Sequence, residues 1–364
     1  MTRPILLAAG GTGGHLFPAA SLAAALKRRG AAVELVTDAR ALKYGGDLPV
    51  DAIHSIPAAT TTGAGALNKA RAAAVLGLGL VAALALIVRL KPRAVVGFGG
   101  YPTVPPLLAA ALLGAPSVLH EQNAVAGRAN RFLAPRVSRV ATGFPDLKGL
   151  PTAFAAKTRY TGNPVRPAVI AAAASPYPAF VDGRLHLLVT GGSQGARVMA
   201  DVVPAALARL SGDERARVRL TMQARGEDKA RVAAACEALQ FPLELADFFS
   251  DLPARIAAAH LVVGRSGAST VSELAVIGRP SILVPFPHAL DQDQAANAAI
   301  LAAAGAATVV PQTQFTAERL AELVRAALAD PAALAKAAAA AQSVGVANAA
   351  DRLADVVLEI AQPS

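Results

Sequence analysis

The sequence predicts an α/β protein built from two Rossmann-like domains that face each other across a cleft, and three observations support this. The length of 364 residues is enough for two domains of roughly 150 residues each. Short apolar runs alternate with longer Ala-rich stretches, the pattern of βαβ units around a parallel sheet. A strand followed by a glycine-rich turn opens each half, at residues 5–15 and 186–197. Because ligands bind at the carboxyl ends of such strands, we expect the active site in the cleft.

The N-terminal domain is expected to cover residues 1–163. Strands are predicted where short apolar runs end in Gly, Thr or Asp, and helices where Ala, Leu and Arg fill longer stretches. The predicted strands are Ile5–Ala9, Val33–Thr37, Ala94–Gly97, Ser117–His120 and Val137–Thr142. The predicted helices are Phe17–Arg29, Ala72–Val88, Val104–Leu113 and Gly127–Leu133.

The C-terminal domain is expected at residues 164–345, opening with a Pro-rich, irregular linker at Pro164–Pro178. Its predicted strands are His186–Thr190, Arg217–Met222, Leu243–Ala246, Leu261–Val263 and Ser281–Val284. The tail Thr316–Ala361 is predicted to be helical. Its last helix, at about 346–361, is a candidate to pack back on the N-terminal domain.

Composition excludes several classes of protein. Hydrophobic residues make up 54% of the chain and charged residues 16%, which excludes an intrinsically disordered chain. The lone cysteine, Cys236, excludes a disulfide framework and a cysteine zinc cluster, and it fits a reducing compartment. The net charge of +10 reflects either a compositional habit or an anionic partner, namely a phosphorylated substrate or anionic lipid. Dispersed arginines and the absence of Trp argue against nucleic acid.

One segment raises the question of a membrane. Every residue from Ala72 to Val88 is apolar or Gly, and Arg71 and Arg89 flank the segment. It is either a buried helix, a helix that dips into a membrane surface, or a membrane span. Its glycines and alanines make a span the weakest of these alternatives. The apolar stretch at the N-terminus is too short for a signal peptide, so we expect a cytoplasmic protein.

The first glycine turn is GGTGGH, residues 10–15, between a strand and a helix. The dinucleotide fingerprint G-x-G-x-x-G matches at Gly11 and Gly13, but Leu16 occupies its third glycine position. A nicotinamide cofactor is therefore not expected, although Asp38 ends the next strand. What the turn provides is close backbone approach at a helix N-terminus, which attracts anions.

His15 stands at the start of that helix, where the helix dipole disfavours a charged imidazole. We interpret it as the general base, the alternative being a histidine that only caps the turn. His120 and Glu121, in the segment HEQNAVAGRANR, are rival bases. Together with Asn123 they are expected to project into the cleft.

The second turn, GGSQGAR at residues 191–197, places three glycines and the Ser193 hydroxyl at another helix start. This pattern is typical of phosphate binding, and the alternative is a tight strand–helix turn. A third site, residues 264–273, has hydroxyls beside Gly267, and Glu273 one turn later could chelate a ribose diol. The alternative there is a capping box formed by Thr270 and Glu273.

A fourth site lies at residues 285–297. Asp291-Gln292-Asp293 resembles the D-x-D motif of metal-dependent sugar transferases, but acids at a helix start are favourable without a metal, so none is expected. Gln294, and with it Gln292 and Asn297, can read sugar hydroxyls.

Taken together, the motifs resemble the MurG family, the N-acetylglucosaminyl transferases of peptidoglycan synthesis. Seven segments carry the resemblance in order along the chain: GGTGGHLFPA, GFGGYPT, LHEQNAVAGRAN, TGNPVR, GGSQGAR, RSGASTVSEL and VPFPHALDQDQAANA. The resemblance implies a GT-B type fold and transfer of GlcNAc from UDP-GlcNAc to the 4-hydroxyl of MurNAc in lipid I, with inversion, to give lipid II. It implies neither a cofactor nor a metal. Cell-wall and division proteins are possible partners.

The resemblance also implies roles for individual residues. Those expected to bind the donor are Thr12, Gly13, Gly14, Asn123, Arg166, Ser193, Phe249, Ala268, Ser269, Thr270, Val271, Ser272, Glu273 and Gln294. Phe249 stands where the family usually has Ile, whose backbone reads uracil. Because lipid I stays in the bilayer, we expect a peripheral protein on the cytoplasmic face of the bacterial inner membrane, bound to anionic lipid through Leu78, Leu80 and Val81.

Three alternatives remain at the level of the sequence. Another lipid-acceptor UDP-sugar transferase would share the phosphate and uridine motifs, but GGTGGH together with HEQN argues against it. A nicotinamide-dependent dehydrogenase is opposed by Leu16. A non-enzymatic membrane scaffold would not need three polar glycine sites.

Overall fold

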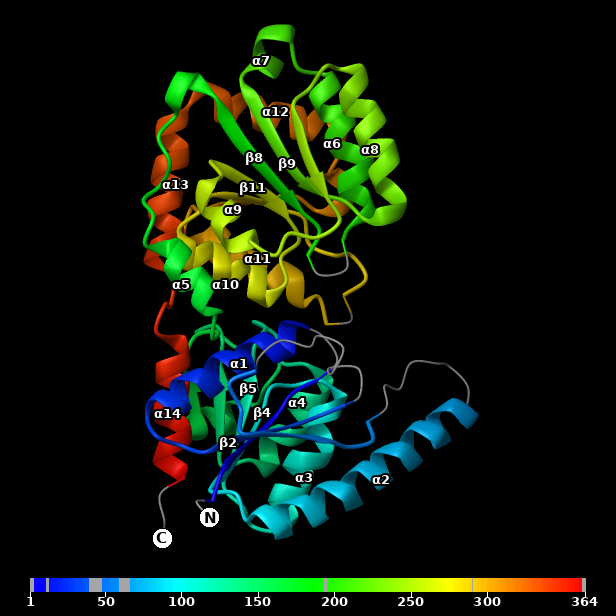
Figure 1. Cartoon of the computed structure of the whole chain (residues 1–364), viewed down its shortest axis with the longest axis vertical. Helices are drawn as coiled ribbons and strands as arrows, with labels where there is room; N and C mark the ends of the chain where they lie inside the picture. Colours follow the sequence, from blue (N-terminus) through cyan, green and yellow to red (C-terminus); the bar gives the residue numbers. More distant parts are fainter. Residues whose placement is uncertain are drawn as a thin grey trace. The chain divides into compact units, whose positions relative to one another are not determined.

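The computed structural model describes residues 3–10, 13–38, 48–58, 66–192, 195–289 and 291–361. The chain forms two compact units. Unit 1 contains Met1–Arg166 and Ala347–Ser364, and unit 2 contains Pro167–Val346. Each unit has one parallel sheet with helices on both faces (Figure 1). The predicted fold class, two α/β domains with parallel sheets, is confirmed.

The sheet of unit 1 has seven strands in the order β3-β2-β1-β4-β5-β6-β7. Its strands are β1 Ile5–Ala8, β2 Val33–Thr37, β3 Ala52–Ser55, β4 Ala94–Gly97, β5 Ser117–Glu121, β6 Arg139–Thr142 and β7 Thr158–Tyr160. Its α-helices are α1 Gly13–Arg28, α2 Ala66–Leu90, α3 Val104–Leu112, α4 Arg128–Leu133 and α14 Ala349–Ile360.

The central strand β1 is covered on both faces. Ile5 and Leu7 pack in one core with residues of α1 and α14, whereas Leu6 and Ala8 pack in a second core with residues of α2 and α3. Successive side chains of a strand point to opposite faces, so a continuous apolar run is what a doubly covered strand requires.

The last helix, α14, belongs to unit 1 although unit 2 precedes it in the chain (Figure 1). Leu353 and Val357 of α14 are buried in the core that α1 shares. Ion pairs reinforce the contact, with Arg28 Nη2 2.9 Å from Asp351 Oδ1.

The sheet of unit 2 has six strands in the order β10-β9-β8-β11-β12-β13. Its strands are β8 Leu185–Thr190, β9 Val218–Gln223, β10 Leu243–Ala246, β11 Leu261–Gly264, β12 Ser281–Leu283 and β13 Ala307–Val309. Its α-helices are α5 Pro167–Ala173, α6 Arg197–Ala208, α7 Gly212–Ala216, α8 Gly226–Ala238, α9 Leu252–Ala258, α10 Ala268–Ile277, α11 Asp293–Ala303, α12 Ala317–Ala329 and α13 Pro331–Ser343. Short 3-10 helices lie at Tyr101–Thr103, Ala134–Arg136, Thr152–Lys157, Val181–Gly183 and Gln312–Gln314.

The structure differs from the predicted elements at several points. Strands β3, β7 and β13 were not predicted; they have only three or four residues each, and those residues are exposed or half-buried. The prediction of an irregular linker is wrong at α5, where Pro167 takes the first helical position and Val169 is buried. Helix α1 begins at Gly13 rather than Phe17, so the last glycines of the first turn are helical.

Candidate functional site

The first candidate site lies in unit 1, where the strand order reverses between β1 and β4. These strands end at the same edge of the sheet, because Ala8 pairs with Gly97 in register. The chain continues from β1 into α1 and from β4 into Phe98–Gly100. Open parallel sheets bind ligands at such reversal points.

His15 occupies the first turn of α1 at this point, next to Gly100. A Cβ atom on Gly100 would lie 3.4 Å from His15 Cε1, and Gly100 has a φ of 74°, which favours glycine. Desolvation lowers the pKa of His15 and outweighs a hydrogen bond with the Gly10 backbone, which raises it. The imidazole is therefore neutral at neutral pH and able to accept a proton.

His120 does not project from the sheet as predicted, because it is fully buried at the end of β5. Its Nε2 atom lies 3.2 Å from the carbonyl oxygen of Gly162, and its ring contacts that of Phe98. Burial lowers the pKa of His120 to about 4. This histidine is held neutral inside the unit, so it is a poor rival to His15 as a base.

Glu121 is also buried, and its carboxylate organises the loop that follows β5. One oxygen accepts a hydrogen bond from Asn123 N at 2.9 Å. The other accepts from Gly127 N at 2.9 Å and from Asn130 Nδ2 at 2.7 Å. Burial raises the pKa of Glu121, and these donors oppose the rise. The carboxylate thus fixes the half-buried Asn123 rather than facing solvent.

Three other predicted residues of unit 1 belong to this region. Gly13 is buried and Gly14 is exposed in the first turn of α1, while Thr12 lies outside the described residues. Arg166 ends unit 1, and its guanidinium carbon lies 4.9 Å from the ring centre of Phe17 in α1. The structure therefore places the Arg166 guanidinium against α1.

The second candidate site lies in unit 2, where the strand order reverses between β8 and β11. The turn after β8 is tight: Gly192 and Gly195 have positive φ angles of 78° and 66°, and Gly195 N donates to Gly192 O at 3.0 Å. Helix α6 begins directly after the turn, and no side chain caps its N-terminus at Ala196. Uncapped N–H groups at a helix start attract anions. Ser193 lies outside the described residues.

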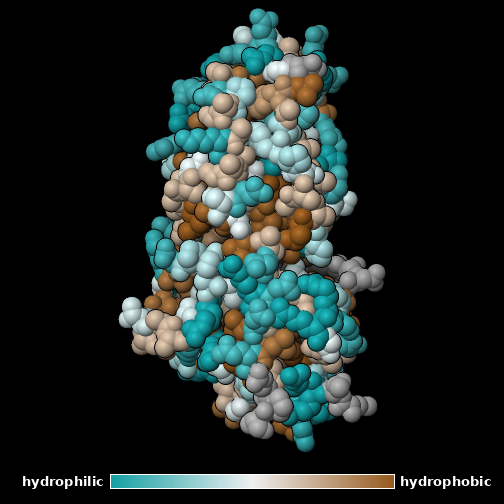
Figure 2. Space-filling model, turned by 90° about the vertical axis from the view of Figure 1, so that its left-hand side faces the viewer, coloured by the Kyte–Doolittle hydropathy of each residue, from teal (hydrophilic) through white to brown (hydrophobic). Residues whose placement is uncertain are grey.

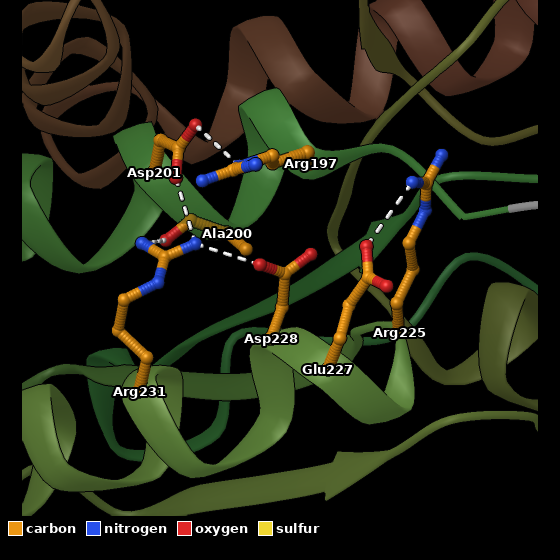
Figure 3. A network of polar contacts seen from close by, with 7 residues as sticks. All are labelled: Arg197, Ala200, Asp201, Arg225, Glu227, Asp228 and Arg231. Atoms are coloured by element: carbon orange, nitrogen blue, oxygen red, sulfur yellow. Dashed lines mark hydrogen bonds and ion pairs between the residues drawn. The ribbon is translucent and has the colours of Figure 1, made fainter.

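An ion pair between α6 and α8 joins the two helices behind this turn (Figure 3). Arg231 of α8 reaches Asp201 of α6 at 2.7 Å and Asp228 of its own helix at 2.8 Å. Arg225, just before α8, donates to Gly195 O at 3.4 Å. The turn is thus packed against the start of α8.

The start of α10 lies beside the turn. Its N-cap is Gly267, which has no side-chain cap, so Thr270 falls inside the first turn and the alternative of a capping box at Thr270 is wrong. Of the predicted segment Ala268–Glu273, Ser269 and Thr270 are half-buried, and Ser272 and Glu273 are largely buried. The Val271 side chain is buried in the core, so this residue can offer a ligand only its backbone.

Gln294 lies in the first turn of α11 and is tied to the loops after β11 and β12. Its Oε1 accepts from Phe286 N at 3.0 Å, and its carbonyl oxygen accepts from Ser266 Oγ at 2.8 Å. Asn297 is buried and donates to Ser266 O at 3.2 Å, so it is structural. Gln292 is exposed at the N-cap. Within the described ranges, no three His, Cys, Asp or Glu side chains are grouped to hold a metal.

Phe249 lies in the loop after β10, which is an edge strand of the sheet of unit 2. Its ring is buried, and the Arg255 guanidinium carbon lies 4.1 Å from the ring centre. That contact anchors the loop, whereas the neighbouring Phe248 is exposed. Arg255 also pairs with Glu244 at 2.6 Å, and both line a groove of about 500 Å³, which none of the predicted site residues line.

Helix α2 carries an apolar stripe on its exposed face. Leu78, Val81 and Val88 are 64%, 65% and 57% exposed. Leu80 is half-buried against the core, so the exposed stripe includes Val88 and not Leu80. Elsewhere, on the face drawn in Figure 2, hydrophobic areas alternate with hydrophilic ones, as on most protein surfaces.

By length and composition, α2 could cross a membrane. Its segment Ala70–Leu90 has 21 residues, and the mean hydropathy over 18 consecutive residues of this segment reaches 2.4. Of those 18 residues, 22% are buried. Its place in the fold argues against a span. The strands before and after it, β3 and β4, belong to the same sheet, so both ends of α2 return to one side of any membrane. Its opposite face packs Ala83, Leu86 and Ile87 into the core.

Comparison with known proteins identifies the family. The N-terminal domain model of glycosyltransferase family 28 matches residues 5–142, and the C-terminal domain model matches residues 186–353. A protein of Methylobacterium sp. strain 4-46 is 58% identical over 98% of this chain and 96% of its own length. It is named UDP-N-acetylglucosamine--N-acetylmuramyl-(pentapeptide) pyrophosphoryl-undecaprenol N-acetylglucosamine transferase. A protein of Sinorhizobium fredii with the same name is 56% identical over 99% of this chain and 96% of its own.

Solved structures agree. The crystal structure of MurG from Acinetobacter baumannii has a TM-score of 0.79 at 29% identity, covering 98% of this chain and 99% of that chain. The calicheamicin glycosyltransferase CalG4 shares the fold, with a TM-score of 0.69 at 17% identity over 99% of this chain and 100% of that chain. The resemblance to the MurG family is confirmed, and the chain belongs to glycosyltransferase family 28.

Proposed function

We propose that this protein transfers GlcNAc from UDP-GlcNAc to the 4-hydroxyl of MurNAc in lipid I, giving lipid II. The names of relatives 55–58% identical over nearly the whole chain support this reaction. The single structural observation that supports this reaction is a pair of helix N-termini without side-chain caps. They belong to α6 and α10, which follow the neighbouring strands β8 and β11 of unit 2. This arrangement suits the diphosphate of a nucleotide sugar.

Unit 2 binds the donor. The N–H groups at the starts of α6 and α10, with the Ser193 hydroxyl, stabilise the pyrophosphate as its charge grows in the transition state. The carboxylate of Glu273 accepts from the ribose hydroxyls, and Ser269 and Thr270 lie one turn before it. The backbone of the Phe249 loop reads uracil. Gln294, whose Oε1 is occupied by Phe286 N, donates from Nε2 to the sugar hydroxyls.

Unit 1 supplies the base and holds the acceptor. The acceptor 4-oxygen bonds to the anomeric carbon as the bond from that carbon to the pyrophosphate oxygen breaks, so UDP leaves from the opposite face and the configuration inverts. The hydroxyl proton passes to the neutral imidazole of His15. We propose that Thr12, Gly13 and Gly14, which precede this histidine in the sequence, line the site, and that Asn123, whose backbone N–H donates to Glu121, binds the donor sugar.

Helix α2 brings unit 1 to the lipid. Leu78, Val81 and Val88 form an apolar stripe, and Arg71 and Arg89 at its ends are exposed. An apolar stripe with cations at its margins suits an interfacial helix on anionic lipid. The protein is thus peripheral, on the cytoplasmic face of the inner membrane, where it meets the polyprenyl-linked acceptor.

Calorimetric titration of the full chain with UDP-GlcNAc, UDP-GalNAc and NAD tests the proposed function. Binding of UDP-GlcNAc in preference to UDP-GalNAc, and no heat with NAD, is the expected result. Binding of NAD alone would overturn the proposal and revive a dehydrogenase.

A further inference from the structure

A buried carboxamide at the carboxyl end of β9 connects three loops of unit 2. Gln223 is 7% exposed. Its Oε1 accepts a hydrogen bond from Thr190 Oγ1 at 2.8 Å, at the end of β8. Its Nε2 donates to Gly192 O at 3.4 Å and to Asp247 O at 3.1 Å. One side chain therefore fixes the ends of β8, β9 and β10 to one another.

Two of these loops have separate tasks in the proposed function. Gly192 lies in the glycine turn that leads to α6, where the pyrophosphate is expected. Asp247 begins the loop that contains Phe249, where uracil is expected. Because the distance between uracil and pyrophosphate is fixed by the nucleotide, the two loops must keep a fixed spacing to bind both groups at once.

The Thr190 hydroxyl strengthens the same link. Besides donating to Gln223, Thr190 Oγ1 accepts from Gly192 N at 3.3 Å. Gly192 has a positive φ, and glycine restrains the backbone least, so the turn gains its shape from such contacts. Both N–H bonds of the Gln223 carboxamide are used, and neither Leu nor Glu can supply them.

We propose that Gln223 is a positioning residue that couples the phosphate and uracil halves of the donor site. This inference rests on the proposed function. Gln223 does not touch the donor in this scheme; it sets the spacing of the two loops that do. Its loss should weaken ligands that span both halves more than ligands that engage one half.

The sequence contains only a weak signal for this role. Gln223 is the polar last residue of the otherwise alternating strand VRLTMQ, at the edge where ligands bind. No neighbouring glycine, charged residue or motif identifies Gln223 as a functional residue. Its importance follows from its three partners, which lie 24 to 33 residues away in the chain.

The test compares Gln223→Leu and Gln223→Glu with wild type and with Thr221→Val. Thr221 lies on the same strand, and Thr221→Val removes a hydrogen bond to Glu244 at 3.4 Å, away from the carboxyl edge, so it is a matched control. Calorimetry gives the Kd for UDP and for UMP, and steady-state kinetics give kcat and the KM of each substrate. Melting temperatures monitor folding.

For both Gln223 variants we expect Kd for UDP and KM for UDP-GlcNAc to rise about tenfold, the scale of one or two lost hydrogen bonds. Kd for UMP should rise less than threefold, and kcat at saturating donor and KM for the acceptor should stay near wild type. Thr221→Val should match wild type. If Gln223→Leu does not fold, Thr190→Val removes the one hydrogen bond that joins Thr190 to Gln223 and should give the same pattern.

Each contrary result is informative. If wild type itself fails to bind UDP, the proposed function is wrong, whatever the variants do. If wild type binds UDP but the variants bind it equally well, or lose UDP and UMP affinity by the same factor, Gln223 does not couple the two halves. A double variant with Thr190→Val should lose less affinity than the sum of the two single losses, because both substitutions remove the hydrogen bond between Thr190 and Gln223, and fully additive losses would also contradict the coupling.

Discussion

Gly264, the last residue of β11, pairs in register with Thr190, the last residue of β8. The two strands thus end side by side, and a Cβ atom on Gly264 would lie 3.1 Å from Thr190 O. As a result, α6 and α10 both begin at this edge of the sheet, with uncapped N–H groups. The proposed donor site depends on this register.

Because helix N-termini stabilise the leaving pyrophosphate in the proposed mechanism, transfer should not need a divalent metal. We expect transfer to a lipid I analogue to proceed in excess chelator at more than half its rate with added magnesium. Activity that disappears with chelator and returns with manganese would assign the charge stabilisation to a metal held by Asp291 and Asp293.

Replacing Glu273 by Gln should weaken UDP-GlcNAc binding by about 1–3 kcal/mol, since a charge-assisted hydrogen bond to ribose is lost. Calorimetry measures the change. Asp330→Ala is the control, because it removes the N-cap of α13 and should lower stability by about 1 kcal/mol without changing UDP affinity. A Glu273 variant that melts lower yet binds normally would show a purely structural carboxylate.

Replacing His15 by Ala should lower kcat roughly 10²–10⁴-fold, the usual range for a lost general base, with little change in Kd for UDP. His54→Ala in the same unit is the control, because His54 of the edge strand β3 pairs with Glu34 of β2 and its loss should leave kcat unchanged. Near-normal turnover of the His15 variant would remove it from the role of base.

The lowered pKa of His15 predicts the pH profile. Its imidazole stays neutral below the ordinary value of 6.5, so kcat/KM for the acceptor should be flat from pH 8 to 6.5 and fall only at lower pH. The acidic limb should be missing in His15→Ala. A limb centred above pH 7 would indicate a different base.

Stability should depend on pH through His120. Its pKa is about 4 in the folded chain, against 6.5 for an unperturbed histidine, so the unfolded chain binds more protons between these values. The free energy of unfolding should therefore fall as the pH drops from 6.5 to 4, by up to about 3 kcal/mol from this group. Urea titrations of wild type and His120→Asn measure it, and equal slopes in both would contradict the burial of a neutral histidine.

The triple variant Leu78→Ser, Val81→Ser, Val88→Ser should bind vesicles of phosphatidylglycerol and phosphatidylcholine at least tenfold more weakly, because it loses the apolar stripe of α2. UDP affinity and melting temperature should be retained. Val181→Ser, an equally exposed apolar residue of unit 2, is the control. Unchanged vesicle binding would place the membrane contact elsewhere, and wild-type protein that resists extraction by alkali would indicate a span.

The fold was predictable where local sequence decides it. The apolar run Ile5–Ala8 and the glycine turns that follow β1 and β8 mark central strands that are buried on both faces. The edge strand β3 escaped prediction because only alternate residues are half-buried there, and β7 and β13 have three residues each. Helix α5 was hidden by its prolines.

The site was predictable as motifs but not as contacts. The glycine turns and the hydroxyls of α10 indicate phosphate chemistry without any knowledge of the fold. Burial could not be predicted in this way, because it depends on residues that are distant in the sequence. His120 and Glu121 were candidate bases in the sequence, but in the fold they bind Gly162 and Asn130 and are buried. The exposure of Val88 rather than Leu80 likewise follows from how α2 packs on its core.

Incubation of the full chain with UDP-GlcNAc and lipid I, followed by mass spectrometry of the lipid product, examines the proposed reaction itself. We expect the acceptor mass to increase by one N-acetylhexosamine, with an inverted, β-configured linkage to the MurNAc 4-oxygen by nuclear magnetic resonance, and no product from the His15→Ala variant on the same timescale. Unchanged lipid I, with the enzyme folded and UDP-GlcNAc bound, would contradict the assignment of lipid I as the acceptor.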